Sequence, residues 1–207
     1  MLLCPDLERD SFMLEKYKKF TIKSKVPKRA KKVFRGLIFD VYQWPQKMFD
    51  GTVEPFEMLR RKNSAMVIGV TTDKKIIIND EQQPDTLRYF ALPGGVIDKG
   101  ETPLQAAKRE LLEEAGYKAK EWMLWDERQV SGKIEWAAYT FIAKECEKIA
   151  DIDPDPGEKI KTRLVSFDEF IDIVVRDDFR ETEAKLRLLE SKFNLREINK
   201  FRKLLLS

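Results

Sequence analysis

The chain contains no histidine, and this absence excludes several kinds of catalytic site. A Ser-His-Asp triad, a papain-like Cys-His pair and a His-ligated zinc site all require an imidazole. General acid–base chemistry must therefore come from carboxylates, lysine, tyrosine or a metal-bound water. Cysteine is scarce as well, because Cys4 and Cys146 are the only two and form no metal-ligand cluster. Such sparse cysteine usage is typical of a reducing cytoplasm.

Long apolar runs are also absent. No stretch approaches the roughly 20 residues that a membrane span needs, and the N-terminal MLLCPDLERD lacks the charged leader and apolar segment of a signal peptide. We therefore expect a cytoplasmic protein without a membrane partner. Hydrophobic residues make up 43% of the 207 residues and aromatic residues 11%, which favours a packed core over disorder.

The net charge of +3 says little about partners, but basic residues cluster between Lys16 and Arg35. The segment reads KYKKFTIKSKVPKRAKKVFR. We interpret this run as a solvated basic arm, which is the usual role of such a segment. The alternative is a patch that faces RNA or a membrane, so a nucleic-acid partner stays open as the less favoured interpretation.

Hydrophobic periodicity predicts a series of strands interrupted and followed by helices. The predicted strands are 36–45, 53–61, 65–72, 74–80, 87–93, 121–130, 134–145 and 162–167. We expect 121–130 and 134–145 to pair antiparallel around Ser131 and Gly132. Helices are predicted at 102–115, at 168–175 with Asp168 as the N-cap, and across 181–206. This order predicts an α/β or α+β sandwich.

Three glutamates, Glu110, Glu113 and Glu114, fall on one arc of the first predicted helix. Glu110 meets both others at three- and four-residue spacing, where like charges repel by roughly 0.2–0.5 kcal/mol per pair. Arg109 lies beside Glu113 by the same spacing, which leaves Glu110 unpaired. Clustered carboxylates suit a hard divalent cation such as Mg²⁺ or Mn²⁺. Taken alone, however, the pattern favours a solvated acidic helix face.

The residues around these glutamates form a longer pattern. From Gly95 the chain continues with five residues, Glu101, seven residues, and then Arg109-Glu110-Leu111-x-Glu113-Glu114-x-Gly116-Tyr117. This spacing resembles the Nudix box at every fixed polar and glycine position, and only Tyr117 departs from the usual aliphatic residue. The resemblance implies a Nudix fold of α/β (α+β) class, a mixed β-sheet sandwich between helices. Here it would carry N-terminal antiparallel strands and a C-terminal helix.

The resemblance also implies roles for these positions. The implied metal ligands are the Gly94 carbonyl, Glu110, Glu113 and Glu114. Glu113, Glu114 and Arg109 would be catalytic, with Arg109 orienting the glutamates and Glu101 as its ion-pair partner. Gly95, next to Gly94, would let the backbone approach the substrate closely, and Gly116 suits a left-handed helix end.

The chemistry implied by the resemblance is hydrolysis of a nucleoside diphosphate linked to another group. Two or more Mg²⁺ or Mn²⁺ ions would neutralise the pyrophosphate and activate a water molecule. The implied division of the chain has three parts. Residues 1–60 would form the basic arm and accessory or dimerisation strands, 61–178 the Nudix catalytic domain, and 179–207 the C-terminal amphipathic helix.

Within the family, the chain resembles the ADP-ribose pyrophosphatase branch most. The resemblance lies in the strands before the box, in EQQP shortly before PGG, and in the acidic loop DIDPDPGEK. Glu158 of that loop stands where the branch often carries a catalytic glutamate, although an ordinary solvated residue is an equal alternative. Gln83 stands where the branch usually has a substrate-binding arginine. Arg88 could replace that arginine, or it could simply be solvated.

Trp44 could stack on an adenine, an interaction that contributes roughly 1–3 kcal/mol, but a core or dimer-interface position is the favoured alternative. The substrate class also stays open. A dinucleoside polyphosphate, a nucleoside triphosphate or an RNA 5′ end would suit the same chemistry, and a domain that senses nucleotide sugars without cleaving them is a further alternative. The N-terminal strands and the apolar C-terminal helix offer surfaces for a homodimer.

Overall fold

The structure of the protein is a computed structural model that describes residues 23–129, 132–192 and 194–207. Residues 16–22 of the expected basic arm, together with Ser131 of the expected turn, lie outside these residues. No helix in the described part of the chain is long and apolar enough to cross a membrane.

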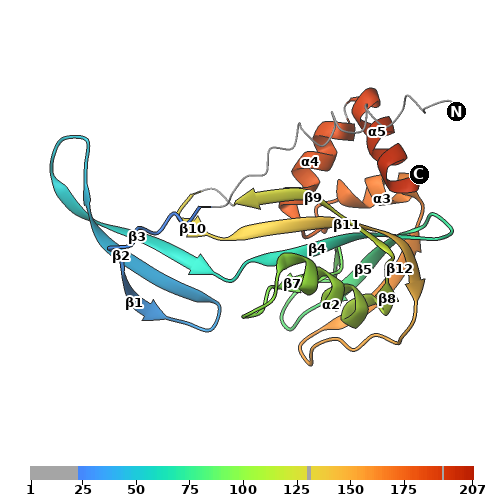
Figure 1. The fold of residues 1–207 in the computed structure, drawn as a ribbon, viewed down its shortest axis with the longest axis horizontal. Coiled ribbons are helices and arrows are strands. Elements are labelled where there is room, and N and C mark those ends of the chain that lie inside the picture. The colour runs from blue at the N-terminus through green and yellow to red at the C-terminus, as the bar shows by residue number, and fades with distance from the viewer. Residues whose placement is uncertain (1–22, 130–131, 193) are drawn as a thin grey trace, which may run out of the picture.

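A mixed sheet carries the centre of the fold (Figure 1). Its strand order is β12-β5-β4-β11-β8, with β6 paired to β5, β7 to β4 and β9 to β11. The strands are β4 (Ser64–Thr71), β5 (Ile76–Gln82), β6 (Tyr89–Ala91), β7 (Gly94–Val96), β8 (Tyr117–Lys118), β9 (Glu121–Gln129), β11 (Ala137–Lys148) and β12 (Lys159–Val165). The antiparallel pairing expected around Gly132 is present between β9 and β11, whereas β4 and β11 run parallel.

Strand β4 is buried along its whole length because helices cover both faces of the sheet. Ile68 and Val70 belong to a core cluster beneath the C-terminal helices. Ala65 and Val67, which point to the other face because side chains alternate along a strand, pack with residues of helix α2 (Pro103–Ala115). Figure 1 shows α2 on one side of the sheet and the remaining helices on the other. The predicted sandwich of α+β class is thereby confirmed.

Helix α2 begins and ends where the sequence predicts. The Thr102 side chain accepts a hydrogen bond from the Gln105 N–H, and the Gln105 side chain accepts one from the Thr102 N–H, which makes a capping box. At the other end, Gly116 has φ 77° and its N–H donates to the carbonyls of Leu111 and Leu112. A residue with a β-carbon would be strained in this left-handed conformation.

Two expectations about the C-terminal helices are wrong. Helix α3 (Phe167–Val174) is capped by Ser166, whose hydroxyl accepts from the Glu169 N–H, and not by Asp168. Asp168 lies within the first turn and forms an ion pair with Arg202. The single helix expected over 181–206 is divided into α4 (Thr182–Lys192) and α5 (Leu195–Leu206). The Asn194 side chain caps α5, which allows the chain to turn there.

A second, smaller sheet extends away from the sandwich (Figure 1). Its order is β1 (Lys31–Arg35), β2 (Phe39–Lys47), β3 (Val53–Arg61) and β10 (Ile134–Glu135). Strand β1 lies within the run interpreted as a basic arm, so this part of the run is sheet. The strand expected at 134–145 is divided at Trp136, because its first two residues pair with β3 and the rest with β4.

The C-terminal helix α5 should contribute strongly to stability through Phe201. This ring is 6% exposed and lies between Trp125 and Phe167, with centroid distances of 5.2 and 6.0 Å. We expect Phe201→Ala to lower the free energy of unfolding by about 3–5 kcal/mol, measured by urea denaturation. Leu195→Ala on the same helix, where the side chain is 79% exposed, should cost less than about 0.5 kcal/mol. Equal effects of the two substitutions would mean that α5 is not docked as described.

Candidate active site

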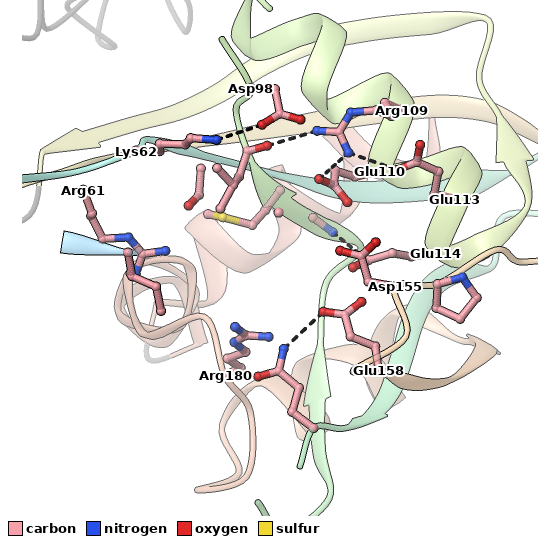
Figure 2. A pocket seen from close by; sticks show the side chains of 18 of the residues that line it. Arg61, Lys62, Asp98, Arg109, Glu110, Glu113, Glu114, Asp155, Glu158 and Arg180 are labelled. Atoms are coloured by element: carbon pink, nitrogen blue, oxygen red, sulfur yellow. Dashed lines mark hydrogen bonds and ion pairs between the residues drawn. The ribbon is translucent and has the colours of Figure 1, made fainter. Parts of the chain in front are cut away.

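A cleft of about 910 Å³ opens where α2, β7 and the loop before β12 meet. Most of its polar lining is carboxylate, and its acidic residues come from segments that are far apart in the sequence. They are Asp98, Glu110, Glu113, Glu114, Asp153, Asp155, Glu158 and Glu181. Figure 2 shows several of these carboxylates directed toward the same space. The fold therefore concentrates negative charge at one edge of the sheet.

Glu114 is the most deeply placed of the box glutamates. Its side chain is 6% exposed, and its Oε2 accepts hydrogen bonds from the Gly94 N–H at 2.8 Å and from the Asn79 amide at 3.3 Å. Burial, together with the nearby Glu81, raises the pKa of Glu114 to about 9. Its hydrogen bonds from Gly94 and Asn79 supply no full positive charge to offset this burial.

Glu110 is 8% exposed, and its burial raises its pKa to about 7. The expectation that Glu110 is unpaired is wrong, because Arg109 Nη1 donates to Glu110 Oε1 at 2.8 Å. Consecutive residues on a helix do not normally face each other, but the long arginine side chain bends back along the helix surface. The pairing offsets only part of the cost of burying Glu110, since its pKa remains raised.

Arg109 connects the helix to the rest of the box. Its guanidinium donates to Glu101 at 2.9 and 3.1 Å, to Glu113 at 2.9 Å and to the Val96 carbonyl at 3.0 Å. The ion pair expected between Arg109 and Glu101 is therefore present. These contacts raise the pKa of Arg109 and fix α2 against the loop that follows β7.

Gly94 and Gly95, at the start of the box, lie in close contact with their surroundings. A β-carbon at Gly95 would lie 2.4 Å from Glu110 Oε1, and one at Gly94 would lie 2.5 Å from the Ala65 carbonyl oxygen. Both distances are far below normal contact. Glycine at these positions allows the carboxylate of Glu110 to lie directly against the backbone of β7.

The acidic loop before β12 brings Glu158, which the sequence left open between a catalytic and a solvated role, into the cleft lining. The Gln83 amide donates to Glu158 Oε1 at 3.1 Å, and both side chains line the cleft (Figure 2). The Asp153 N–H donates to the Glu113 carbonyl at 2.7 Å, which ties the loop to α2. Gln83 and Glu158 therefore face the box glutamates from another part of the chain.

Two residues expected to bind substrate lie elsewhere. Trp44 is 6% exposed and packs against Phe56, with ring centroids 5.0 Å apart, inside the small sheet. Its position in the core confirms the alternative interpretation and removes it from stacking on a base. Arg88 is exposed and paired with Asp80 at 2.9 Å, outside the cleft lining. The Arg88 guanidinium points toward the Asp80 carboxylate, which neutralises the positive charge of Arg88.

Several cleft residues were not predicted. Arg61 comes from the end of β3, Trp136 from between β10 and β11, and Arg180 and Glu181 from the segment before α4. The carboxyl of Glu181 accepts from the Leu92 N–H at 3.0 Å, and burial raises its pKa to about 8. No local spacing links these residues to the box, so only the folded chain brings them together.

The donor set fits a hard divalent cation. Within the described residues, no three acidic or cysteine side chains converge closely enough to hold a metal by themselves, and Glu113 accepts a hydrogen bond from Arg109. Mg²⁺, however, is commonly bound by one or two carboxylates with waters and substrate phosphates. Glu110 and Glu114 supply such carboxylates. Next to Glu114, Asn79 Oδ1 is buried without a hydrogen-bond partner among the described residues.

Comparisons with known proteins give a consistent result. The sequence model of the NUDIX domain matches residues 60–188. The chain is 26% identical to the ADP-ribose pyrophosphatase of Bacillus subtilis (strain 168) over 162 residues, which cover 77% of this chain and 80% of that protein. It is 36% identical to an RNA pyrophosphohydrolase of Brucella anthropi over 106 residues, which cover 42% of this chain and 60% of that protein.

A solved structure described as an ADP compounds hydrolase is similar in fold. The TM-score is 0.65 at 20% sequence identity, over 78% of this chain and 89% of the other. The similarity extends well beyond the box and includes the surrounding sandwich. Because the NUDIX domain match spans more than half of the 207 residues and contains the glutamate helix, this chain belongs to the Nudix family and is a Nudix pyrophosphohydrolase.

Proposed function

We propose that this enzyme hydrolyses the pyrophosphate bond of ADP-ribose, or of a related nucleotide sugar, in a metal-dependent reaction that gives AMP and a sugar phosphate. The observation that carries the proposal is the pair of buried carboxylates, Glu110 and Glu114, at the wall of the cleft. Its volume of about 910 Å³ lies within the roughly 300–1,000 Å³ of small-molecule sites. The Bacillus subtilis relative, which matches 77% of the chain, supports the choice of substrate.

Mg²⁺ or Mn²⁺ would be held by Glu110 and Glu114, with Glu113 and the Gly94 carbonyl as further donors. When bound, the cation would neutralise phosphate charge and activate water. Arg109 positions Glu110 and Glu113 through its hydrogen bonds. Glu101 in turn holds Arg109 in place.

Glu158 is the general base in this proposal. The oxygen of a water molecule attacks one phosphorus, the bond from that phosphorus to the bridging oxygen breaks, and the water proton passes to the Glu158 carboxylate. Gln83 orients Glu158 through its amide N–H, and the Gly95 backbone lies beside the reacting group. Gly116 acts only through the end of α2.

A second candidate substrate is an RNA 5′ end. The similarity to an RNA pyrophosphohydrolase favours it, and the basic segment before Arg35 could recruit RNA. That similarity covers 42% of the chain, against 77% for the ADP-ribose pyrophosphatase. For this reason we place the nucleotide sugar first. Dinucleoside polyphosphates and nucleoside triphosphates carry the same anhydride bond and rank below both, as does binding of a nucleotide sugar without cleavage.

We also propose that the enzyme is a cytoplasmic homodimer. The small sheet and its loops expose several large apolar side chains, namely Val33, Phe34, Leu37, Ile38, Phe49 and Val53. Covering this surface with a second copy would remove apolar area from water. In this division, residues 1–60 form the dimerisation part, 61–178 the catalytic domain and 179–207 a C-terminal helical part.

The first prediction concerns hydrolysis. With Mg²⁺ present, the protein should convert ADP-ribose to AMP and ribose 5-phosphate, and EDTA should abolish the reaction. Glu114→Gln should lower the rate at least about a hundredfold, the scale for losing one preorganised charge contact. Glu54→Gln, at an exposed position of β3 outside the cleft, should retain the wild-type rate. A panel with other nucleotide sugars, diadenosine polyphosphates, nucleoside triphosphates and 5′-triphosphate RNA identifies the substrate, and faster cleavage of the RNA would reject our choice.

The second prediction concerns metal binding. Mg²⁺ should raise the melting temperature, because a ligand at a hundredfold excess over its Kd stabilises the folded state by about 2.7 kcal/mol. Differential scanning fluorimetry should show this rise for the wild type and for Glu54→Gln. The rise should be lost in Glu114→Gln and reduced in Glu110→Gln. An equal rise in all four proteins would place the metal outside the box.

The third prediction concerns assembly. Sedimentation velocity should give a species of twice the 24.3 kDa chain mass, and Phe34→Asp should shift it to the monomer because a charge would be buried in the interface. Leu195→Asp, at an exposed position of α5, should leave the dimer intact. A wild type that stays monomeric at high concentration would remove the homodimer proposal.

A further inference from the structure

The cleft has a second wall whose charge is opposite to that of the glutamate helix. Arg61 and Arg180 line it, and Figure 2 shows both on the far side of the space from Glu110 and Glu114. The other two basic residues of the lining already have close partners. Lys62 is paired with Asp98 at 2.9 Å, and Arg109 is engaged by the box carboxylates.

Arg61 is held flat and partly buried by aromatic rings. Its guanidinium lies 4.5 Å from the centroid of Trp136 and 5.9 Å from that of Phe39. Burial lowers the pKa of Arg61, and the positive charge of Arg180 lowers it further. In the part of the chain that the structure describes, no carboxylate offsets these effects on Arg61. The preceding residue, Arg60, is in contrast paired with Glu135 at 2.6 Å.

Arg180 is fixed by backbone contacts, although it lies between two helices. The Phe90 N–H donates to the Asp178 carbonyl at 2.7 Å, and the Arg180 N–H donates to the Phe90 carbonyl at 2.9 Å. This bridge aligns the segment before α4 with β6. The segment therefore presents Arg180 to the cleft from a defined position.

The Arg180 side chain also has contacts within the protein, but these contacts engage only some of its N–H donors. Its Nη1 donates to the Tyr89 hydroxyl at 3.0 Å and lies 3.6 Å from Glu81 Oε2. A guanidinium carries five N–H donors, and about half of this side chain is exposed. Donors therefore remain for a ligand in the cleft.

Two guanidinium groups that repel each other on the same wall of a cleft create a site for an anion. Each presents a planar fork of N–H donors, which matches the oxygens of a phosphate group. A metal on the glutamate side and arginines on the other side would give alternating charge across a pyrophosphate. The charge pattern of the two walls thus suits the group that the enzyme cleaves.

We propose that Arg61 and Arg180 bind the phosphoryl oxygens of the substrate that face away from the glutamates. The identity of the substrate rests on the proposed function. The further proposal concerns only the binding of phosphate by this pair of arginines. Arg61 and Arg180 are substrate-binding residues in this proposal. Gln83, whose amide is engaged by Glu158, supplies no charge there.

The test is the equilibrium binding of inorganic pyrophosphate with Mg²⁺, measured by calorimetry. Arg61→Gln and Arg180→Gln should each weaken binding about tenfold or more, as expected for the loss of a charge-assisted hydrogen bond. Arg180→Lys should recover part of the affinity because it restores the charge without the fork. Arg29→Gln removes an exposed arginine outside the cleft and should bind like the wild type.

Kinetics with ADP-ribose then separate this proposal from the proposed function. If ADP-ribose is not cleaved but the two variants lose pyrophosphate, the substrate assignment fails and the phosphate-binding pair stands. If ADP-ribose is cleaved, both variants should lower kcat/KM by at least the same factor. Unchanged pyrophosphate affinity in Arg180→Gln, or a wild type that binds no pyrophosphate, overturns the proposal. Should Arg61→Gln fail to fold without its ring contacts, Arg61→Lys and Arg180→Gln carry the test.

Discussion

The geometry of the cleft depends on one guanidinium. Arg109 contacts three carboxylates and the Val96 carbonyl, and without it Glu110 and Glu113 would repel each other one turn apart on α2. The hydrogen bonds of Arg109 have two effects on the site. It ties Glu113 away from the centre of the cleft, and it fixes α2 so that Glu110 and Glu114 stay buried against β7. Their unbalanced charge is the property that a divalent cation would relieve.

Much of the fold could be predicted from the sequence because its signals are local. Alternating apolar residues marked most strands of the main sheet, and Thr102 and Gly116 marked the ends of α2 correctly. Local signals failed where two choices were close in energy. Ser166 and Asp168 are both good N-caps, and the apolar pattern of 181–206 continues across the turn at Asn194. The Lys-rich composition of β1 concealed a strand whose side chains are all exposed.

The sequence predicted the part of the candidate site that helix α2 and the loop before it contribute, and little of the rest. Gln83 and Glu158 both line the cleft, but the sequence alone left Glu158 equally open to a solvated position and gave Gln83 only as a departure from the branch. Trp44 and Arg88 were open between a substrate contact and a core or solvated position, and burial in the small sheet and pairing with Asp80 decide for the second of these. Arg180 was missed because its position depends on a bridge to Phe90, a contact between segments about ninety residues apart. No sequence pattern within either segment indicates that the two segments contact each other.

The absence of space at Gly95 has a consequence for how this enzyme can change over generations. A β-carbon there would lie 2.4 Å from Glu110 Oε1, so a larger residue at this position would displace the Glu110 carboxylate. The opposite wall is assembled from the ends of separate elements, around Gln83, Glu158 and Arg180. A substitution at Gln83 or Arg180 would change the cleft without removing a hydrogen-bond partner of Glu110 or Glu114. Variants with another substrate preference are therefore expected at such positions rather than at Gly95.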